Sequence, residues 1–103
     1  MGLEINDGNI TEILGNSSII VVDFWAEWCG PCRMLGPTIE ELAIENEDIV
    51  IGKMNVDENE LTPKQYGIRG IPTIIFFKGG KEVERVVGVK SKAELQAKID
   101  ALR

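Results

Sequence analysis

Cys29 and Cys32 are the residues of this chain whose type and spacing most directly indicate chemistry. They enclose Gly30 and Pro31, and they follow a strongly apolar run that ends at Trp25. Two thiols at this spacing can close into a disulfide and reopen, which is two-electron redox chemistry. The pair could instead be a structural crosslink or part of a metal site.

The composition weakens both of these alternatives. Closing a loop of about four residues stabilises a fold by roughly 2 kcal/mol, against about 3 kcal/mol for a loop of 15 residues. A zinc site needs about four ligands, and the chain has two cysteines and no histidine. A zinc site shared across a dimer is an alternative that we consider improbable. A Cys-x-x-Cys motif beside a strand–helix–strand pattern favours a redox pair, and we expect no bound metal.

The local sequence predicts that a helix begins near Cys29. Unpaired backbone N–H groups and the positive end of the helix dipole would stabilise a thiolate there. Pro31 suits the first turn of a helix, where its missing N–H is not needed. Gly30 would let another chain approach the sulfur. We therefore expect Cys29 to be an exposed nucleophile and Cys32 to be its resolving partner.

The overall composition fits one globular domain over residues 1–103, with 44% hydrophobic and 27% charged residues. The net charge of −6 gives no basic surface for nucleic acid or anionic membranes. No apolar run approaches the roughly 20 residues that span a bilayer. The first residues lack the features of a signal peptide, so we expect a cytoplasmic protein.

Strand and helix patterns alternate along the chain. Nearly continuous apolar runs predict buried strands over residues 19–25 and 49–56, which need helices on both faces. Gly79-Gly80 suits a tight hairpin. The other predicted elements are helices over 7–14, 32–47, 60–66 and from Ser91 onward, strands over 73–78 and 82–87, and an edge strand over 2–6. This order indicates a three-layer α/β/α domain whose mixed central sheet has four to five strands, flanked by about four helices.

Two charged residues interrupt the buried strands. Asp23 lies within Ile-Ile-Val-Val-Asp-Phe-Trp, and burial there would raise its pKa and make it a candidate proton acceptor or donor. The alternative is a solvated carboxylate at a strand end. Lys53 could offset this charge, or it could extend its ammonium group to the surface.

Pro72 opens a predicted strand, where proline costs the sheet a hydrogen-bond donor. Only about 5–6% of X–Pro bonds in folded proteins are cis, so spacing alone predicts a trans Ile71–Pro72 bond. Gly70 and Gly88 taken singly are typical turn residues.

Several segments together resemble the thioredoxin family. Val-Asp-Phe-Trp-Ala-Glu-Trp-Cys-Gly-Pro-Cys-Arg-Met (residues 22–34) is similar to its active-site segment, and Tyr-Gly-Ile-Arg-Gly-Ile-Pro-Thr (66–73) to its second motif. Phe-Lys-Gly-Gly (77–80), Val-Gly (87–88) and Pro37 inside a helix also match. The resemblance runs from about residue 3 to the C-terminus. Arg33 and Gly36 depart from the residues more usual there.

The resemblance implies a thioredoxin fold and a role for each site residue. Cys29 would attack and Cys32 resolve. Asp23 would handle the Cys32 proton through water, with Lys53 nearby, and Pro72 would be cis, against the prediction from spacing. Trp25 would be structural. The implied apolar docking surface consists of Trp28, Gly30, Pro31, Val56, Gly70, Ile71, Pro72, Val87 and Gly88.

The resemblance also implies a function, which is general reduction of protein disulfides by a thiol–disulfide oxidoreductase. Its partners would be disulfide-containing proteins and a thioredoxin reductase, either a flavoprotein or a ferredoxin-linked enzyme. We expect a monomer without a bound cofactor. The alternatives are an oxidant or isomerase of disulfides and a non-catalytic binding module. Gly-Pro between the cysteines resembles reductants, and an intact cysteine pair argues against binding alone.

Overall fold

The computed structural model describes residues 3–103, so the Gly2 end of the predicted edge strand lies outside the described residues. The first strand is shorter than predicted, and the remaining elements follow the predicted order. The elements are β1 (Leu3–Glu4), α1 (Ile10–Asn16), β2 (Ile19–Trp25), α2 (Gly30–Glu45), β3 (Val50–Asn55), α3 (Leu61–Gln65), β4 (Thr73–Lys78), β5 (Lys81–Val87) and α4 (Lys92–Leu102).

The strands form a mixed five-stranded sheet in the order β1-β3-β2-β4-β5. β1 and β2 both pair with β3 in parallel, whereas β4 is antiparallel to β2 and to β5. The parallel strands β2 and β3 therefore end at the same edge of the sheet, and β4 begins there. In this register Asp23 lies between Lys53 on one side and Ile74 on the other.

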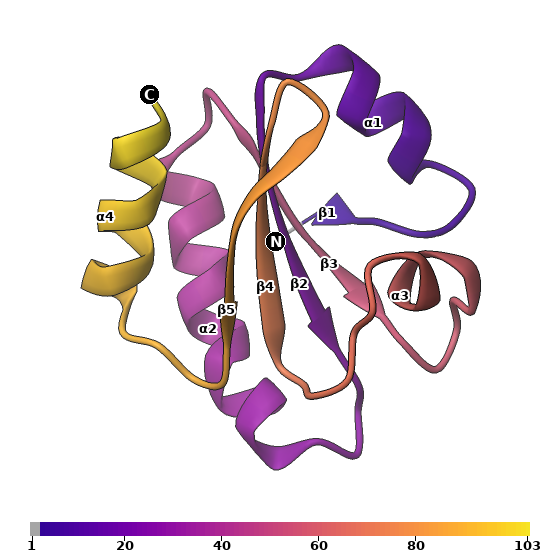
Figure 1. The fold of residues 1–103 in the computed structure, drawn as a ribbon. Coiled ribbons are helices and arrows are strands. Elements are labelled where there is room, and N and C mark those ends of the chain that lie inside the picture. Colours follow the sequence, from indigo (N-terminus) through magenta and orange to yellow (C-terminus); the bar gives the residue numbers. More distant parts are fainter. Residues whose placement is uncertain (1–2) are drawn as a thin grey trace.

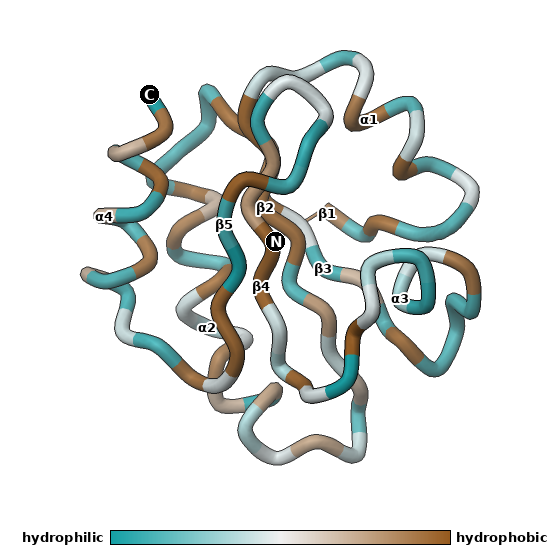
Figure 2. Tube along the Cα trace, in the orientation of Figure 1, coloured by the Kyte–Doolittle hydropathy of each residue, from teal (hydrophilic) through white to brown (hydrophobic). Residues whose placement is uncertain are grey.

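Helices cover both faces of the sheet, with α2 and α4 on one side and α1 and α3 on the other (Figure 1). An apolar core lies between each helical layer and the sheet. Val21 of β2 belongs to the core that α2 and α4 cover, whereas its neighbours Ile20 and Val22 belong to the core on the α1 and α3 side. Figure 2 shows the hydrophobic residues concentrated on the strands between the helices. Burial of both faces explains why the β2 sequence is continuously apolar.

The start of α1 differs from the prediction over residues 7–14. The Asn6 side chain accepts hydrogen bonds from the backbone N–H groups of Gly8 and Asn9, so residues 6–9 form a turn. The Asp7 carboxylate instead accepts from the backbone N–H groups of Leu61 and Thr62. Asp7 thus satisfies the first N–H groups of α3, and α1 begins only at Ile10.

Replacing either of two glycines with alanine should change the stability of the fold, in opposite directions. Gly36 lies inside α2, and a Cβ added there meets no atom within 4 Å apart from its two chain neighbours and the backbone of the helix itself. We expect Gly36→Ala to raise the free energy of unfolding by about 0.5–1 kcal/mol, because alanine loses less backbone entropy in a helix. A Cβ at Gly52 would lie 2.4 Å from the Leu3 carbonyl oxygen, so Gly52→Ala should destabilise. Urea unfolding of both variants tests the pair, and a destabilising Gly36→Ala would contradict the expectation.

Candidate functional site

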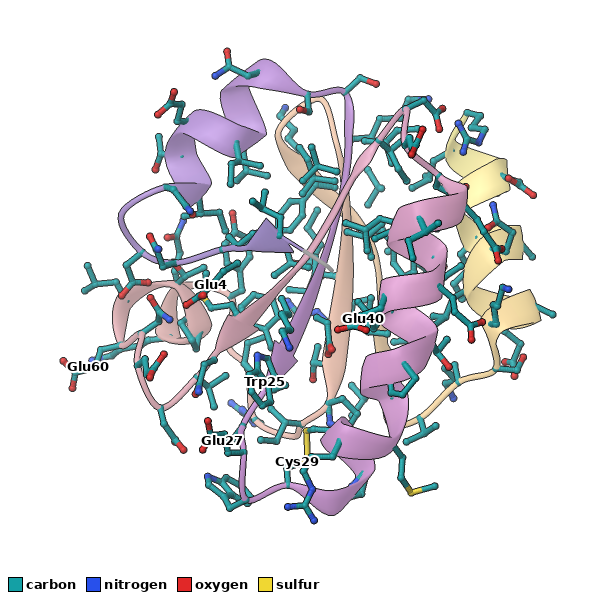
Figure 3. All side chains as sticks on the ribbon, turned by 180° about the vertical axis from the view of Figure 1, so that it is seen from behind. Glu4, Trp25, Glu27, Cys29, Glu40 and Glu60 are labelled. Carbon is teal, nitrogen blue, oxygen red and sulfur yellow. A yellow bond between two sulfur atoms is a disulfide. The ribbon has the colours of Figure 1, made fainter. Side chains whose placement is uncertain are left out.

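The two cysteines form a disulfide between the end of β2 and the first turn of α2. Figure 3 shows this bond at the start of the α2 ribbon, near the end of the sheet where Trp25 lies. Cys29 is the N-cap residue of α2, and its sulfur accepts the backbone N–H of Cys32 at 3.1 Å. α2 begins at Gly30 with Cys29 as its N-cap, which confirms the predicted helix start near Cys29 and lies two residues before the range 32–47 expected from the apolar spacing. Both cysteines are therefore held by the helix start. The unpaired N–H groups there favour a thiolate on reduction.

Burial does not separate the two sulfurs in this disulfide form. Cys29 is 4% exposed and Cys32 is 2% exposed, so the expectation of an exposed Cys29 is wrong. The reason is the apolar packing of the neighbours Ala26, Trp25, Val56 and Ile71 around the disulfide. What distinguishes Cys29 is its position, because its sulfur lies 3.8 Å from the Ile71 carbonyl oxygen.

The Ile71–Pro72 bond is cis, so the expectation from the resemblance is confirmed and the one from spacing is wrong. The Pro72 carbonyl accepts the backbone N–H of Gly88 at 2.8 Å. Gly88 has φ +92°, a backbone conformation that glycine adopts readily, as its reading as a turn residue expects. A Cβ built at Gly70 would contact Val87 at 3.5 Å. Segments 70–72 and 87–88 therefore meet beside Cys29.

Trp28 is 70% exposed, and its indole N–H donates to the Asp57 carboxylate at 2.8 Å. Asp57 follows the end of β3, and Trp28 follows the end of β2. Parallel strands place these ends together. Asp57 is not among the site residues predicted from the sequence, although its position after a buried parallel strand was a usable signal.

Asp23 is buried, as predicted, at 2% exposed. Its Oδ1 has no hydrogen-bond partner among the described residues. Burial raises the pKa of this carboxyl to about 7, while the nearby Lys53 ammonium lowers it. The Lys53 Nζ lies 4.6 Å from the centre of the Trp25 ring. Lys53 thus does offset the charge of Asp23, and it also packs over an aromatic face.

A disulfide at a helix start, beside a cis proline and following a strand that contains a buried carboxyl, defines a thiol–disulfide oxidoreductase on an α/β/α scaffold. In residues 3–103 no group of three or more Cys, Asp, Glu or His side chains is arranged to hold a metal ion. The described helices include none that is long and apolar enough to cross a membrane.

Comparisons with known proteins agree with this class. The family model described as Thioredoxin matches residues 3–101. The thioredoxin of Acidithiobacillus ferridurans is 50% identical over 97 residues, covering 93% of this chain and 90% of its own. Thioredoxin 2 of Chlorobaculum tepidum is 52% identical over 99 residues, covering 94% and 91%.

A solved structure is similar over nearly the whole chain. It is a mutant thioredoxin from Halobacterium salinarum NRC-1, with a TM-score of 0.91 at 36% identity, covering 98% of this chain and 89% of its own. The chain belongs to the thioredoxin family. It is a dithiol reductant of disulfides, with Cys29 and Cys32 as its redox pair.

Proposed function

We propose that Cys29 is the attacking thiolate and Cys32 the resolving thiol in the reduction of protein disulfides. The Cys29 sulfur attacks one sulfur of the substrate disulfide, and the other substrate sulfur leaves as a thiolate. Cys32 then attacks Cys29 and releases the second substrate sulfur. The substrate gains two electrons, and the protein is left with the Cys29–Cys32 disulfide. The observation that carries these roles is Cys29 at the helix N-cap, 3.8 Å from the Ile71 carbonyl oxygen.

Asp23 is proposed to take the Cys32 proton through water in the second step. It lies on the sheet face that α2 covers, since its alternate neighbour Val21 packs in the same core as Leu35 and Ile39 of α2. A carboxyl with a pKa of about 7 can both accept and return a proton near neutrality. Lys53 is proposed to stabilise the ionised state of Asp23.

The partner's disulfide segment is proposed to dock on the apolar surface around Cys29, formed by Trp28, Gly30, Pro31, Val56, Gly70, Ile71, Pro72, Val87 and Gly88. This surface would bury apolar side chains of the substrate, and the Ile71 backbone would bind its main chain. Two observations support this assignment. Trp28 is exposed, and the segments 70–72 and 87–88 lie close together.

Two valines of β5 test the docking surface. Val87 is 56% exposed at the C-terminal end of β5, which lies near the cysteines, and Val83 is 49% exposed four residues earlier in the same strand. We expect Val87→Asp to raise the KM for a protein disulfide about tenfold, because a carboxylate would be desolvated on docking. Reduction of a small aromatic disulfide should change little. Val83→Asp is the control, and an equal effect of both variants would contradict the assignment.

We further propose that the recharging partner is a thioredoxin reductase of the flavoprotein or the ferredoxin-linked class, and that the protein works in the cytoplasm. A low-potential reductant needs a compartment that supplies reducing equivalents. Redox titration of Cys29 and Cys32 tests the direction of electron flow. A potential of about −120 to −180 mV would indicate an oxidant or isomerase instead. Assays with each reductase class then separate the recharging partners.

A further inference from the structure

A pocket of about 320 Å³, lined mostly by charged side chains, opens around Lys53, and apart from Lys53 its residues have no role in the reaction proposed above. Trp25, Lys53 and Asn55 line it from the ends of β2 and β3. The remaining lining residues are four glutamates, Glu4, Glu27, Glu40 and Glu58. The pocket therefore holds one cation among four carboxylates, and Lys53 is the cation that also acts on Asp23.

Lys53 lies between two sets of acidic groups. Asp23 is its direct neighbour across the β2–β3 ladder, and side chains at paired positions point to the same face. From other elements, the four glutamates line the space around it. Among residues 3–103 no carboxylate oxygen lies within 4.0 Å of the Lys53 ammonium, which rests over the Trp25 ring instead. No salt bridge among the described residues therefore fixes the position of this charge.

Glu40 differs from the other three glutamates in two ways. It is half-buried, whereas Glu4, Glu27 and Glu58 are exposed, so solvent screens its field least. It is also the one that α2 supplies to the pocket, from the helix that starts at the cysteines. Figure 3 shows its side chain projecting from α2 toward the strands.

We propose that Glu40 is a positioning residue that holds the Lys53 ammonium in the pocket over Trp25, and so limits how strongly this charge acts on Asp23. This inference deepens the proposed function, because it rests on Asp23 as the proton acceptor for Cys32. Without the Glu40 charge, the remaining acidic groups around Lys53 are its strand neighbour Asp23 and three exposed glutamates. A cation closer to Asp23 favours its ionised form.

The test is an NMR titration of the Asp23 carboxyl carbon in the oxidised protein, in which the cysteines do not titrate. We expect Glu40→Gln to lower the titration midpoint of Asp23 by about half a pH unit. Glu41→Gln is the matched control, because Glu41 is the next residue on α2 and pairs with Lys92 at 3.2 Å. It should leave the midpoint unchanged.

Glu40→Gln in a Lys53→Met background shows whether Glu40 affects Asp23 by positioning Lys53 or through the electric field of its own carboxylate. If Glu40 acts through Lys53, Glu40→Gln produces no shift once the ammonium is gone. An unchanged midpoint in the single variant, an equal shift from Glu41→Gln, or a full shift in the Lys53→Met background would each overturn the proposal. The titration needs no turnover, so failure of wild-type disulfide reduction would count against the proposed function alone.

Discussion

Replacing Cys32 with serine should convert the protein from a turnover catalyst into a trap. Cys29 would still attack a substrate disulfide, but no second thiol would release the mixed disulfide. Mass spectrometry should then find substrate attached to Cys29, and the attachment should disappear on treatment with a small thiol. Multiple turnover should fall at least about 10³-fold, because the intramolecular step loses the effective concentration of its nucleophile.

Cys29→Ser should abolish turnover without trapping substrate. A hydroxyl at this position is not ionised near neutrality and does not attack disulfides. The two serine variants remove the same disulfide, so a loss of stability would affect both and cannot produce trapping by only one. Mixed disulfides on Cys32 of the Cys29→Ser variant, or substantial turnover by it, would contradict the assignment of roles.

Asp23→Asn should change how stability depends on pH. The pKa of Asp23 is about 7 in the fold against 3.8 for a free carboxyl, so the folded protein holds a proton that the unfolded chain releases. The stability linked to this proton is fully present below pH 3.8 and is lost as pH rises to about 7. The difference between the two pKa values corresponds to a loss of roughly 4 kcal/mol of unfolding free energy by pH 8, relative to acidic pH.

The measurement is urea unfolding of wild type and variant from pH 4 to pH 9. The difference between the two should move in favour of Asp23→Asn as pH rises, and then level off above about pH 7. Asp48 and Glu84 have lowered pKa values, so they make stability increase with pH in a more acidic range. Their contributions are the same in both proteins and cancel when the free energy of unfolding of the variant is subtracted from that of wild type. A pH-independent difference would show that Asp23 is not protonated in the fold. The variant should also resolve mixed disulfides more slowly.

The fold was predictable because its main signals are local. The apolar run of β2, the Gly79-Gly80 hairpin and the helix start at Ser91 each carry their structure within a few residues, and all three appear as expected. The start of α1 was not predictable in this way. Asp7 is a plausible helix-start residue by type, but Leu61 and Thr62 bind its carboxylate from 54 and 55 residues away.

The site was predictable to the extent that its chemistry lies in short motifs. The cysteine pair and the buried Asp23 could be found from spacing and from a charge inside an apolar run. The cis bond at Pro72 came from resemblance alone, because statistics favour trans. The near-complete burial of Cys29 and the Glu40 pocket both depend on which strand ends meet. No local pattern fixes that.

The discontinuity of the docking surface has a consequence for synthesis on the ribosome. The chain emerges from its N-terminal end, so Cys29 and Cys32 are exposed before Ile71, Pro72 and Gly88 exist. Until β4 pairs with β2 and β5 pairs with β4, Ile71 does not pack against the two cysteines. Its carbonyl group is also not yet beside Cys29. The thiols of the nascent chain are therefore made before the segments that we propose select the substrate, which lie in the last third of the chain.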